Sequence, residues 1–380
     1  MPFEITLNDL PAGYAASAGK KGEKVSVITR EFTSSEDGDI FISRLEGYPS
    51  QIINSIPSGS GVKSSTVDHL LAIIRRDKTA TVYVNELSIV VKATIKGRDI
   101  EAGLFIYSDD IADIQKLEFH GITIPDDVGI IVLLSKGWRK GLYYDLKPLV
   151  PPDFSPRDYD LEMLCGQYYA YLSFQHLFKL TDAEWDALIA QKWFPFISLK
   201  HRTIQEIINY AKAGWNVDGL TEKIGEELTE LLPAMLKKWE RNNLFQSHLP
   251  IFKQAVERYL AGDYISTTSN LYPRIEGLMR TYLSSLSQNI RPSSKNLVAS
   301  VVDAGSKQRH SFSLLLPNNF RRYLEDVYFA NFDPNNPDVL SRHSVAHGVA
   351  PVDDYSLKGA TIGLLILDQL SFYLGSQNNP

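Results

Sequence analysis

The sequence predicts a multidomain α+β protein, in which a mainly β N-terminal domain is followed by an all-α C-terminal region that ends in a helical bundle. At 380 residues, the chain is longer than one hydrophobic core usually covers. Apolar residues make up 44% and charged residues 22%, which is ordinary for a globular protein and excludes wholesale disorder. The period of the apolar pattern changes from two to 3.6 near residue 148, as expected where strands give way to helices.

Residues 1–148 form the predicted β domain, because their apolar residues alternate with polar ones and are rich in β-branched and aromatic types. Strands are expected at Lys24–Thr29, Thr79–Val84, Ser88–Ile95, Glu101–Tyr107, Val128–Leu134 and Leu142–Leu146. Residues Lys96–Asp99 and Lys136–Gly141 supply turn chemistry between strands. The segment Val67–Arg76 fits a strand or a short helix, and its periodicity does not decide.

A proline-rich linker is predicted at residues 149–157, because four prolines between Pro148 and Pro156 block helix continuation and central-strand pairing. Beyond it, helices with one apolar stripe are expected. A helical subdomain (158–245) contains Tyr159–Phe178, Asp182–Phe194, Thr203–Ala213 and Thr221–Trp239. A terminal bundle (246–380) contains Leu249–Leu260, Ser269–Ser287, Ser294–Val302, Asn318–Phe329, Pro337–His347 and Leu357–Leu374. Thr181 and Glu184 have the spacing of a capping box.

Charge and cysteine content exclude several classes of protein. The net charge of −6 means that any contact with nucleic acid is local. The single cysteine, Cys165, excludes an internal disulfide and multi-cysteine metal sites, and its helical surroundings predict a buried small hydrophobe.

The N-terminus has no secretory pattern, and the apolar run Ala360–Leu367 is too short to span a bilayer. We expect a soluble cytoplasmic protein that makes no membrane contact.

Two further segments have weak functional signals. Residues 59–65 contain a Gly-Ser-Gly run with a lysine, but Val62 separates Gly61 from Lys63, which a phosphate-binding loop requires to be adjacent. A flexible loop is the expected structure there. Trp138, flanked by Arg139 and Lys140 at the end of a predicted hairpin, is a candidate RNA contact, because an exposed aromatic ring among cations can stack a base.

Local signals near the C-terminus define a short helix of about eleven residues. Asn336 is suited to the N-cap, Pro337 to the first helical position and Asp338 to the positive end of the helix. Gly348 can adopt the left-handed conformation that ends a helix. The helix is predicted to span Pro337–His347.

Three nitrogen donors, Arg342, His343 and His347, lie near the end of this predicted helix. At about 100° per residue, the two histidines are about 40° apart on the helix surface, and Arg342 is about 140° from His347. Cleavage of RNA by its own 2′-hydroxyl needs a base, an acid and a cation beside the phosphorus. Histidine suits either proton transfer near neutral pH, and the guanidinium fork matches phosphate oxygens, so no metal or other cofactor is needed.

The segment Arg342–His347 resembles the arginine-(four to six residues)-histidine motif of the HEPN superfamily, and it lies on the penultimate helix before a long apolar helix. The resemblance covers roughly the last 130 residues, the size of one bundle domain. It implies that Arg342 and His347 are the catalytic pair and His343 the polar auxiliary. Glu276 and Ser344 are supporting residues, Glu276 because its place on an earlier bundle helix suits it to orient the arginine or a histidine.

The resemblance also implies an activity and partners. Many members of this all-α family are metal-independent endoribonucleases of anti-phage and toxin systems, and they are typically homodimers whose paired motifs form one composite site. The expected partners are therefore RNA as substrate, a second copy of the chain, and an antitoxin or regulatory protein. Residues 1–245 resemble no family, and we expect the β domain to serve sensing or substrate selection.

Other interpretations of the same residues stay open. His343 and His347 have the i,i+4 spacing of two zinc ligands, with Asp353 or Asp354 as further ligands, although the glutamate of a zinc-protease helix is missing. The bundle can also be a non-catalytic HEPN-type module that binds a nucleotide or a partner. In a purely structural interpretation, Arg342 pairs with Glu276 or with Asp338.

Overall fold

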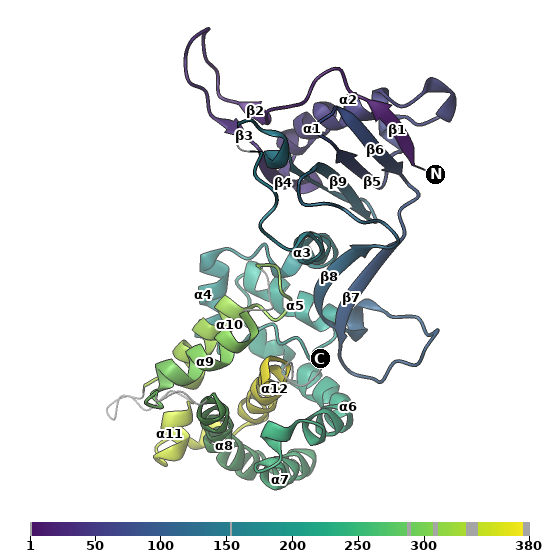
Figure 1. Cartoon of the computed structure of the whole chain (residues 1–380). Coiled ribbons are helices and arrows are strands. Elements are labelled where there is room, and N and C mark those ends of the chain that lie inside the picture. The colour runs from purple at the N-terminus through teal and green to yellow at the C-terminus, as the bar shows by residue number, and fades with distance from the viewer. Residues whose placement is uncertain (1, 153, 287–289, 307–310, 332–340, 375–380) are drawn as a thin grey trace. The chain divides into compact units, whose positions relative to one another are not determined.

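The computed structural model describes residues 2–152, 154–286, 290–306, 311–331 and 341–374. The chain divides into two compact units, which are described separately (Figure 1). Unit 1 comprises Met1–Lys92 and Lys116–Ser173, and unit 2 comprises Ala93–Gln115 and Phe174–Pro380. The α+β class is confirmed, since an N-terminal antiparallel sheet is followed by C-terminal helices.

Unit 1 is built on a six-stranded antiparallel sheet in the order β1-β6-β5-β9-β10-β4. Its strands are β1 (Phe3–Thr6), β4 (Arg30–Ser34), β5 (Leu70–Ile74), β6 (Thr79–Val84), β9 (Gly129–Lys136) and β10 (Arg139–Asp145). Leu70, Ala72 and Ile74 pack in one core with the helices α1 (Asp39–Glu46) and α2 (Tyr48–Asn54). Leu71 and Ile73 pack in a second core with α3 (Leu161–Phe174). Because both faces of β5 are covered, its continuous apolar run is a strand, which settles the ambiguity of Val67–Arg76.

Two smaller strand pairs complete the β structure: β2 (Tyr14–Ala16) with β3 (Val27–Ile28), and β7 (Ile89–Ile95) with β8 (Ile111–Phe119). The base of the β7–β8 hairpin belongs to unit 1 and its tip to unit 2. The predicted strand Glu101–Tyr107 is wrong, because this segment is an irregular loop at the tip. Gly103 at φ +87° interrupts it, and its apolar side chains, including Phe105, are exposed.

The boundary between the units falls at Ser173 instead of in the predicted linker 149–157. The reason is the packing of α3, whose Cys165 and Leu172 are buried with Leu71 and Ile73 of the sheet. The first helix beyond the prolines therefore completes the core of unit 1. Burial raises the pKa of the Cys165 thiol to about 12, in agreement with its expected role as a small hydrophobe.

Unit 2 is mainly helical and joins the predicted subdomain and bundle in one compact unit. Its helices are α4 (Asp182–Ala190), α5 (His201–Lys212), α6 (Thr221–Glu240), α7 (Leu249–Leu260), α8 (Tyr264–Ser285), α9 (Ser294–Ser306), α10 (Pro317–Tyr323), α11 (Arg342–Ala346) and α12 (Leu357–Leu374). The capping box of Thr181 and Glu184 is confirmed at the start of α4. A π-helical turn, Leu324–Tyr328, continues α10.

Helix α12 is the central element of unit 2 and contacts α6, α8 and α9 (Figure 1). Of the described helices, it is the one long and apolar enough to cross a membrane, but most of it is buried inside the unit. Its burial is that of the core helix of a helical domain. Because α6 and α12 pack directly, the division predicted at residue 245 does not separate two cores.

The tip of the β7–β8 hairpin is anchored to the rest of unit 2 by polar contacts, of which those of Asp113 are buried. Asp113 accepts hydrogen bonds from the Ser313 hydroxyl at 2.7 Å and from the Leu314 backbone at 2.9 Å. Asp109 accepts a hydrogen bond from the His201 backbone at 2.6 Å. The tip therefore forms part of the helical unit, and it brings Lys96 and Arg98 beside α6 and α12.

Candidate functional site

Helix α11 carries the predicted catalytic residues, and it begins later than predicted. Ser341 is extended at φ −142° and ψ 168°, so its predicted place inside the helix Pro337–His347 is wrong. Its predicted N-terminal residues Asn336, Pro337 and Asp338 lie outside the described residues. Gly348 has φ +69° and ends the helix, as predicted.

The start of α11 is fixed by a buried pair of serines. The Ser344 backbone donates to the Ser341 hydroxyl oxygen at 3.2 Å, and the Ser341 backbone donates to Oγ of Ser344 at 2.9 Å. This reciprocal capping satisfies two backbone donors at the helix start. Ser344 therefore sets the position of Arg342 and His343 through the backbone.

Glu276 on α8 is the anchor of the site, and only 4% of its surface is exposed. Its carboxylate forms ion pairs with Nε of Arg342 and, at 2.6 Å, with Nη2 of Arg280. The Arg342 side chain is 23% exposed, and that of Arg280 is more exposed. One carboxylate thus holds two guanidinium groups, which leaves a local surplus of one positive charge on a chain of negative net charge.

His343 is held by the same arginine. Nδ1 of its ring lies 3.1 Å from Nη1 of Arg342. Because a guanidinium only donates, the imidazole accepts at Nδ1 and is neutral in this arrangement. Burial and, second, the Arg342 charge lower the pKa of His343, which favours the same neutral form. The carboxylate of Glu276 acts in the opposite direction.

His347 lies at the end of α11, where it caps the helix and is exposed. Its backbone donates to the His343 carbonyl oxygen at 3.1 Å. The structure therefore brings Glu276, Arg342 and His343 into direct contact, while Ser344 pairs with Ser341 at the start of the helix. It places His347 one helical turn beyond His343 at the surface.

Two residues next to the site were missed by the sequence analysis. Arg280 follows Glu276 by four positions, and this spacing on a helix was a usable signal. Tyr328 is fully buried and donates from its hydroxyl to the Tyr272 carbonyl oxygen at 2.6 Å. Burial, reinforced by the charge of Glu276, raises the pKa of Tyr328, so it stays neutral beside the ion pairs.

The candidate RNA contact at Trp138 belongs to unit 1. Gly137 and Trp138 form the turn between β9 and β10, as predicted, and Trp138 is 71% exposed. The Arg139 guanidinium lies 5.0 Å from the centre of the Trp138 ring, and Lys140 pairs with Asp68 at 3.2 Å. The ring is thus accessible on a small cationic hairpin, while both neighbouring cations already have partners.

The metal interpretation finds no ligand set in the part of the chain that the structure describes. No group of three or more His, Cys, Asp or Glu side chains is arranged there to hold a metal ion. Asp354, one of the further ligands considered, lies 3.8 Å from the Lys192 ammonium. A histidine pair alone does not make a zinc site, which needs at least three protein ligands.

Comparisons with family models, curated proteins and solved structures give no match. The resemblance to the HEPN superfamily therefore rests on the motif residues and their setting.

Proposed function

We propose that the protein is a metal-independent endoribonuclease that cleaves RNA by attack of the 2′-hydroxyl, at a HEPN-type site composed from two copies of the chain. The observation that supports this most is the contact of the buried Glu276 carboxylate with Arg342, which in turn contacts His343. This arrangement fixes a guanidinium at a surface where a second histidine, His347, is exposed one helical turn away.

Each step of the reaction has a group to perform it. A base removes the proton of the 2′-hydroxyl, the 2′-oxygen forms a bond to phosphorus, and the bond from phosphorus to the 5′-oxygen breaks as that oxygen is protonated. His347 is assigned to proton transfer, because it is exposed and reaches solvent. Arg342 is assigned to stabilising the negative charge on the phosphoryl oxygens. His343 is assigned to positioning Arg342. The products are a 2′,3′-cyclic phosphate and a 5′-hydroxyl.

A second copy of the chain supplies the other proton-transferring group. One copy offers a single exposed histidine at this site, whereas a twofold dimer of α11 offers two, one as base and one as acid. Val349 and Val352 are exposed just beyond His347, and they provide apolar surface for such a contact. A role in anti-phage defence or in a toxin system is part of the same proposal, with a regulatory partner that restrains the activity.

The proposal is tested with purified full-length protein and single-stranded RNA in the presence of EDTA. We expect cleavage with 2′,3′-cyclic phosphate ends, and we expect His347→Ala to lower the rate by about 100-fold or more, the usual contribution of general acid–base catalysis. Since His347 is exposed, the variant should unfold at the same temperature as the wild type. His120→Ala, which removes an exposed histidine of unit 1, is the matched control and should cleave normally.

A binding module without catalysis is the second candidate, and one observation favours it. Nε and Nη1 of Arg342 are already engaged by Glu276 and His343, so that the guanidinium has fewer donors left for a scissile phosphate. In that case the protein binds RNA or nucleotide and leaves every RNA intact.

The composite site is tested separately by the oligomeric state. A strictly monomeric protein in light scattering would contradict a site formed from two copies of the chain.

A further inference from the structure

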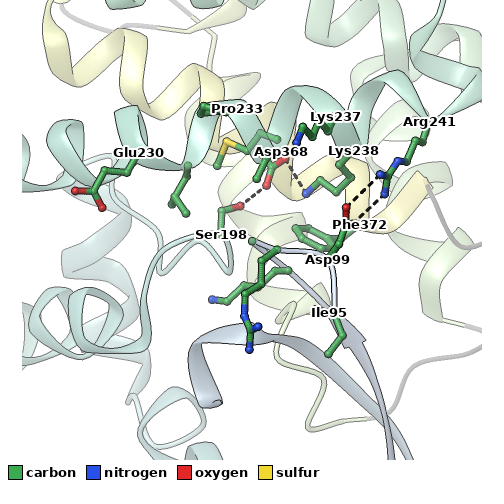
Figure 2. Close-up of a pocket in the computed structure, with 16 residues that line it drawn as sticks. Ile95, Asp99, Ser198, Glu230, Pro233, Lys237, Lys238, Arg241, Asp368 and Phe372 are labelled. Atoms are coloured by element: carbon green, nitrogen blue, oxygen red, sulfur yellow. Dashed lines mark hydrogen bonds and ion pairs between the residues drawn. The ribbon is translucent and has the colours of Figure 1, made fainter. Parts of the chain in front are cut away.

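A second polar site lies in unit 2, apart from the residues of the proposed ribonuclease site. It is a cavity of about 460 Å³ between the tip of the β7–β8 hairpin, the C-terminal half of α6 and α12 (Figure 2). Five cationic side chains line it, Lys96, Arg98, Lys237, Lys238 and Arg241, together with three acidic ones, Asp99, Glu230 and Asp368. The lining therefore has a surplus of two positive charges.

One wall of the cavity is rigid. The carboxylate of Asp368 accepts hydrogen bonds from the Ser198 hydroxyl at 2.5 Å and from the Trp239 indole at 2.8 Å, and it pairs with the Lys238 ammonium at 2.7 Å. Figure 2 shows the Ser198 and Lys238 contacts as dashed lines. The same ammonium lies 3.4 Å from the centre of the Phe372 ring. The negative charge of Asp368 is therefore neutralised within the protein by the Lys238 ammonium.

The other two acidic groups are also engaged. Asp99 pairs with Arg241 at 3.1 Å, and Glu230 pairs with Lys200 at 2.9 Å. Arg98 is held by Asp110, outside the cavity lining, at 2.6 Å. Of the five lining cations, this leaves Lys96 and Lys237 with no carboxylate of the described residues at ion-pair distance.

Of these two lysines, Lys96 is the stronger indication of an anion site, because it is only 5% exposed. Its ammonium donates to the carbonyl oxygens of Ile197 and, at 2.6 Å, of Leu199. An ammonium has three protons, so one donor is left over. Burial lowers the pKa of Lys96 to about 8, which leaves it mostly charged at neutral pH. Asp109, Glu227 and Asp368 attract this charge from beyond ion-pair distance, whereas buried charges in proteins are normally paired directly.

We propose that this cavity binds a small organic phosphate, with the phosphoryl group at Lys96 and Lys237 and the organic part against Leu231, Ala234 and Met235 of α6. A phosphate monoester carries a charge of about −1.5 to −2 at neutral pH, which matches the surplus of two positive charges. The cavity volume is within the usual range of ligand sites, about 300–1,000 Å³. This inference does not depend on the proposed ribonuclease activity.

The test uses the full-length protein and isothermal titration calorimetry with adenosine 5′-monophosphate, inorganic pyrophosphate and adenosine as probes. We expect both phosphate-bearing probes to bind and adenosine to bind at least about tenfold more weakly than its monophosphate. Lys237→Ala should weaken binding by about tenfold, since one charge-assisted contact is lost. Lys237 is exposed and has no ion pair within the described parts of the chain, so this variant keeps the fold.

Two controls make the outcomes decisive. Lys253→Ala removes a lysine of α7 that pairs with Glu240 outside the cavity, and it should bind the probes like the wild type. His347→Ala should also bind them normally, so a failure of the ribonuclease proposal is distinguishable. Absence of binding of both phosphate-bearing probes at millimolar concentration would overturn the inference, as would binding that is unchanged in Lys237→Ala. Lys96→Met, if it folds, should lose binding as well.

Discussion

Two of the buried carboxylates of unit 2 bind cations in different ways. Asp368 on α12 is 1% exposed and meets one ammonium and two neutral donors, the Trp239 indole and the Ser198 hydroxyl. Glu276 on α8 is almost as deeply buried, but it meets two guanidinium groups, those of Arg280 and Arg342. The charges balance at Asp368, whereas at Glu276 one positive charge is left over.

This difference separates a structural carboxylate from one that presents cations. Asp368 joins α12 to α6 and to the segment that contains Ser198, and its two neutral donors belong to the core. Glu276 holds two partly exposed guanidinium groups, and one of them, that of Arg342, contacts His343. The charge of the donors, more than the burial of the acceptor, therefore indicates which carboxylate supports the fold and which supports a surface site.

The largest expected effect on stability is that of Asp368→Asn. The amide keeps the shape of the side chain but turns one acceptor into a donor that faces other donors, and it leaves Lys238 without its counter-charge. Loss of one partner of a buried pair typically costs about 3–5 kcal/mol, and because 32% of the Lys238 side chain is exposed we expect about 3 kcal/mol. Urea unfolding followed by tryptophan fluorescence measures it.

The matched control is Glu230→Gln in the same cavity. Glu230 pairs with Lys200 at 2.9 Å, but both side chains are exposed, so the free energy of unfolding should change by less than about 0.5 kcal/mol. Equal losses in the two variants would remove the distinction between a structural and a surface carboxylate.

The sequence predicted those elements whose patterns are long and uninterrupted. The bounds of α7, α12 and β6 agree with the prediction at both ends, because each is a strongly patterned segment with clear flanking signals. Glu101–Tyr107 has strand-forming residues but no partner strand, and strand propensity alone does not form a sheet. The start of α11 differs from the prediction, which depended on Asn336 and Pro337, because the buried pair of Ser341 and Ser344 fixes the start that the structure shows.

The candidate site was predictable mainly where its members are close in sequence, and the one distant member that was predicted, Glu276, does pair with Arg342. Arg342, His343 and His347 form a local motif, and Arg280 follows Glu276 by one helical turn. The contact of Glu276 with Arg342 joins two helices, and its geometry required the tertiary structure. The cavity near Lys96 gave no sequence signal, because its lining comes from the hairpin tip, α6 and α12, which meet only in the fold.

Glu276→Gln should have a smaller effect on stability than Asp368→Asn, although both acids are buried. Arg280 and Arg342 are partly exposed and can turn to water when the negative charge is removed, so we expect a loss of about 1–2 kcal/mol. RNA cleavage should fall much more than stability, since Arg342 is then no longer fixed. Urea unfolding and the cleavage assay, run on the same preparation, measure the two effects. A loss of stability as large as that of Asp368→Asn would assign Glu276 to the fold.

The smallest effect, and the most specific, concerns the titration of His343. Burial and the Arg342 charge lower its pKa, while the Glu276 charge raises it. Arg342→Ala should therefore raise the pKa of His343 and Glu276→Gln should lower it further, because a cation disfavours the imidazolium and a carboxylate favours it. NMR titration of the histidine ring protons measures both shifts, and His343→Gln assigns the resonance.

The lowered pKa of His343 also makes the free energy of unfolding sensitive to acid. Because its pKa is lowered in the folded chain, the unfolded chain takes up the proton first as the pH falls through about 6.5, the ordinary value for histidine. The free energy of unfolding therefore decreases as the pH falls through this range, and the decrease should be smaller in Arg342→Ala. If the pKa of His343 shifted in the same direction in Arg342→Ala and in Glu276→Gln, the two charges would not act on His343 separately. The surplus cation at Glu276 would then not account for the neutral state of His343.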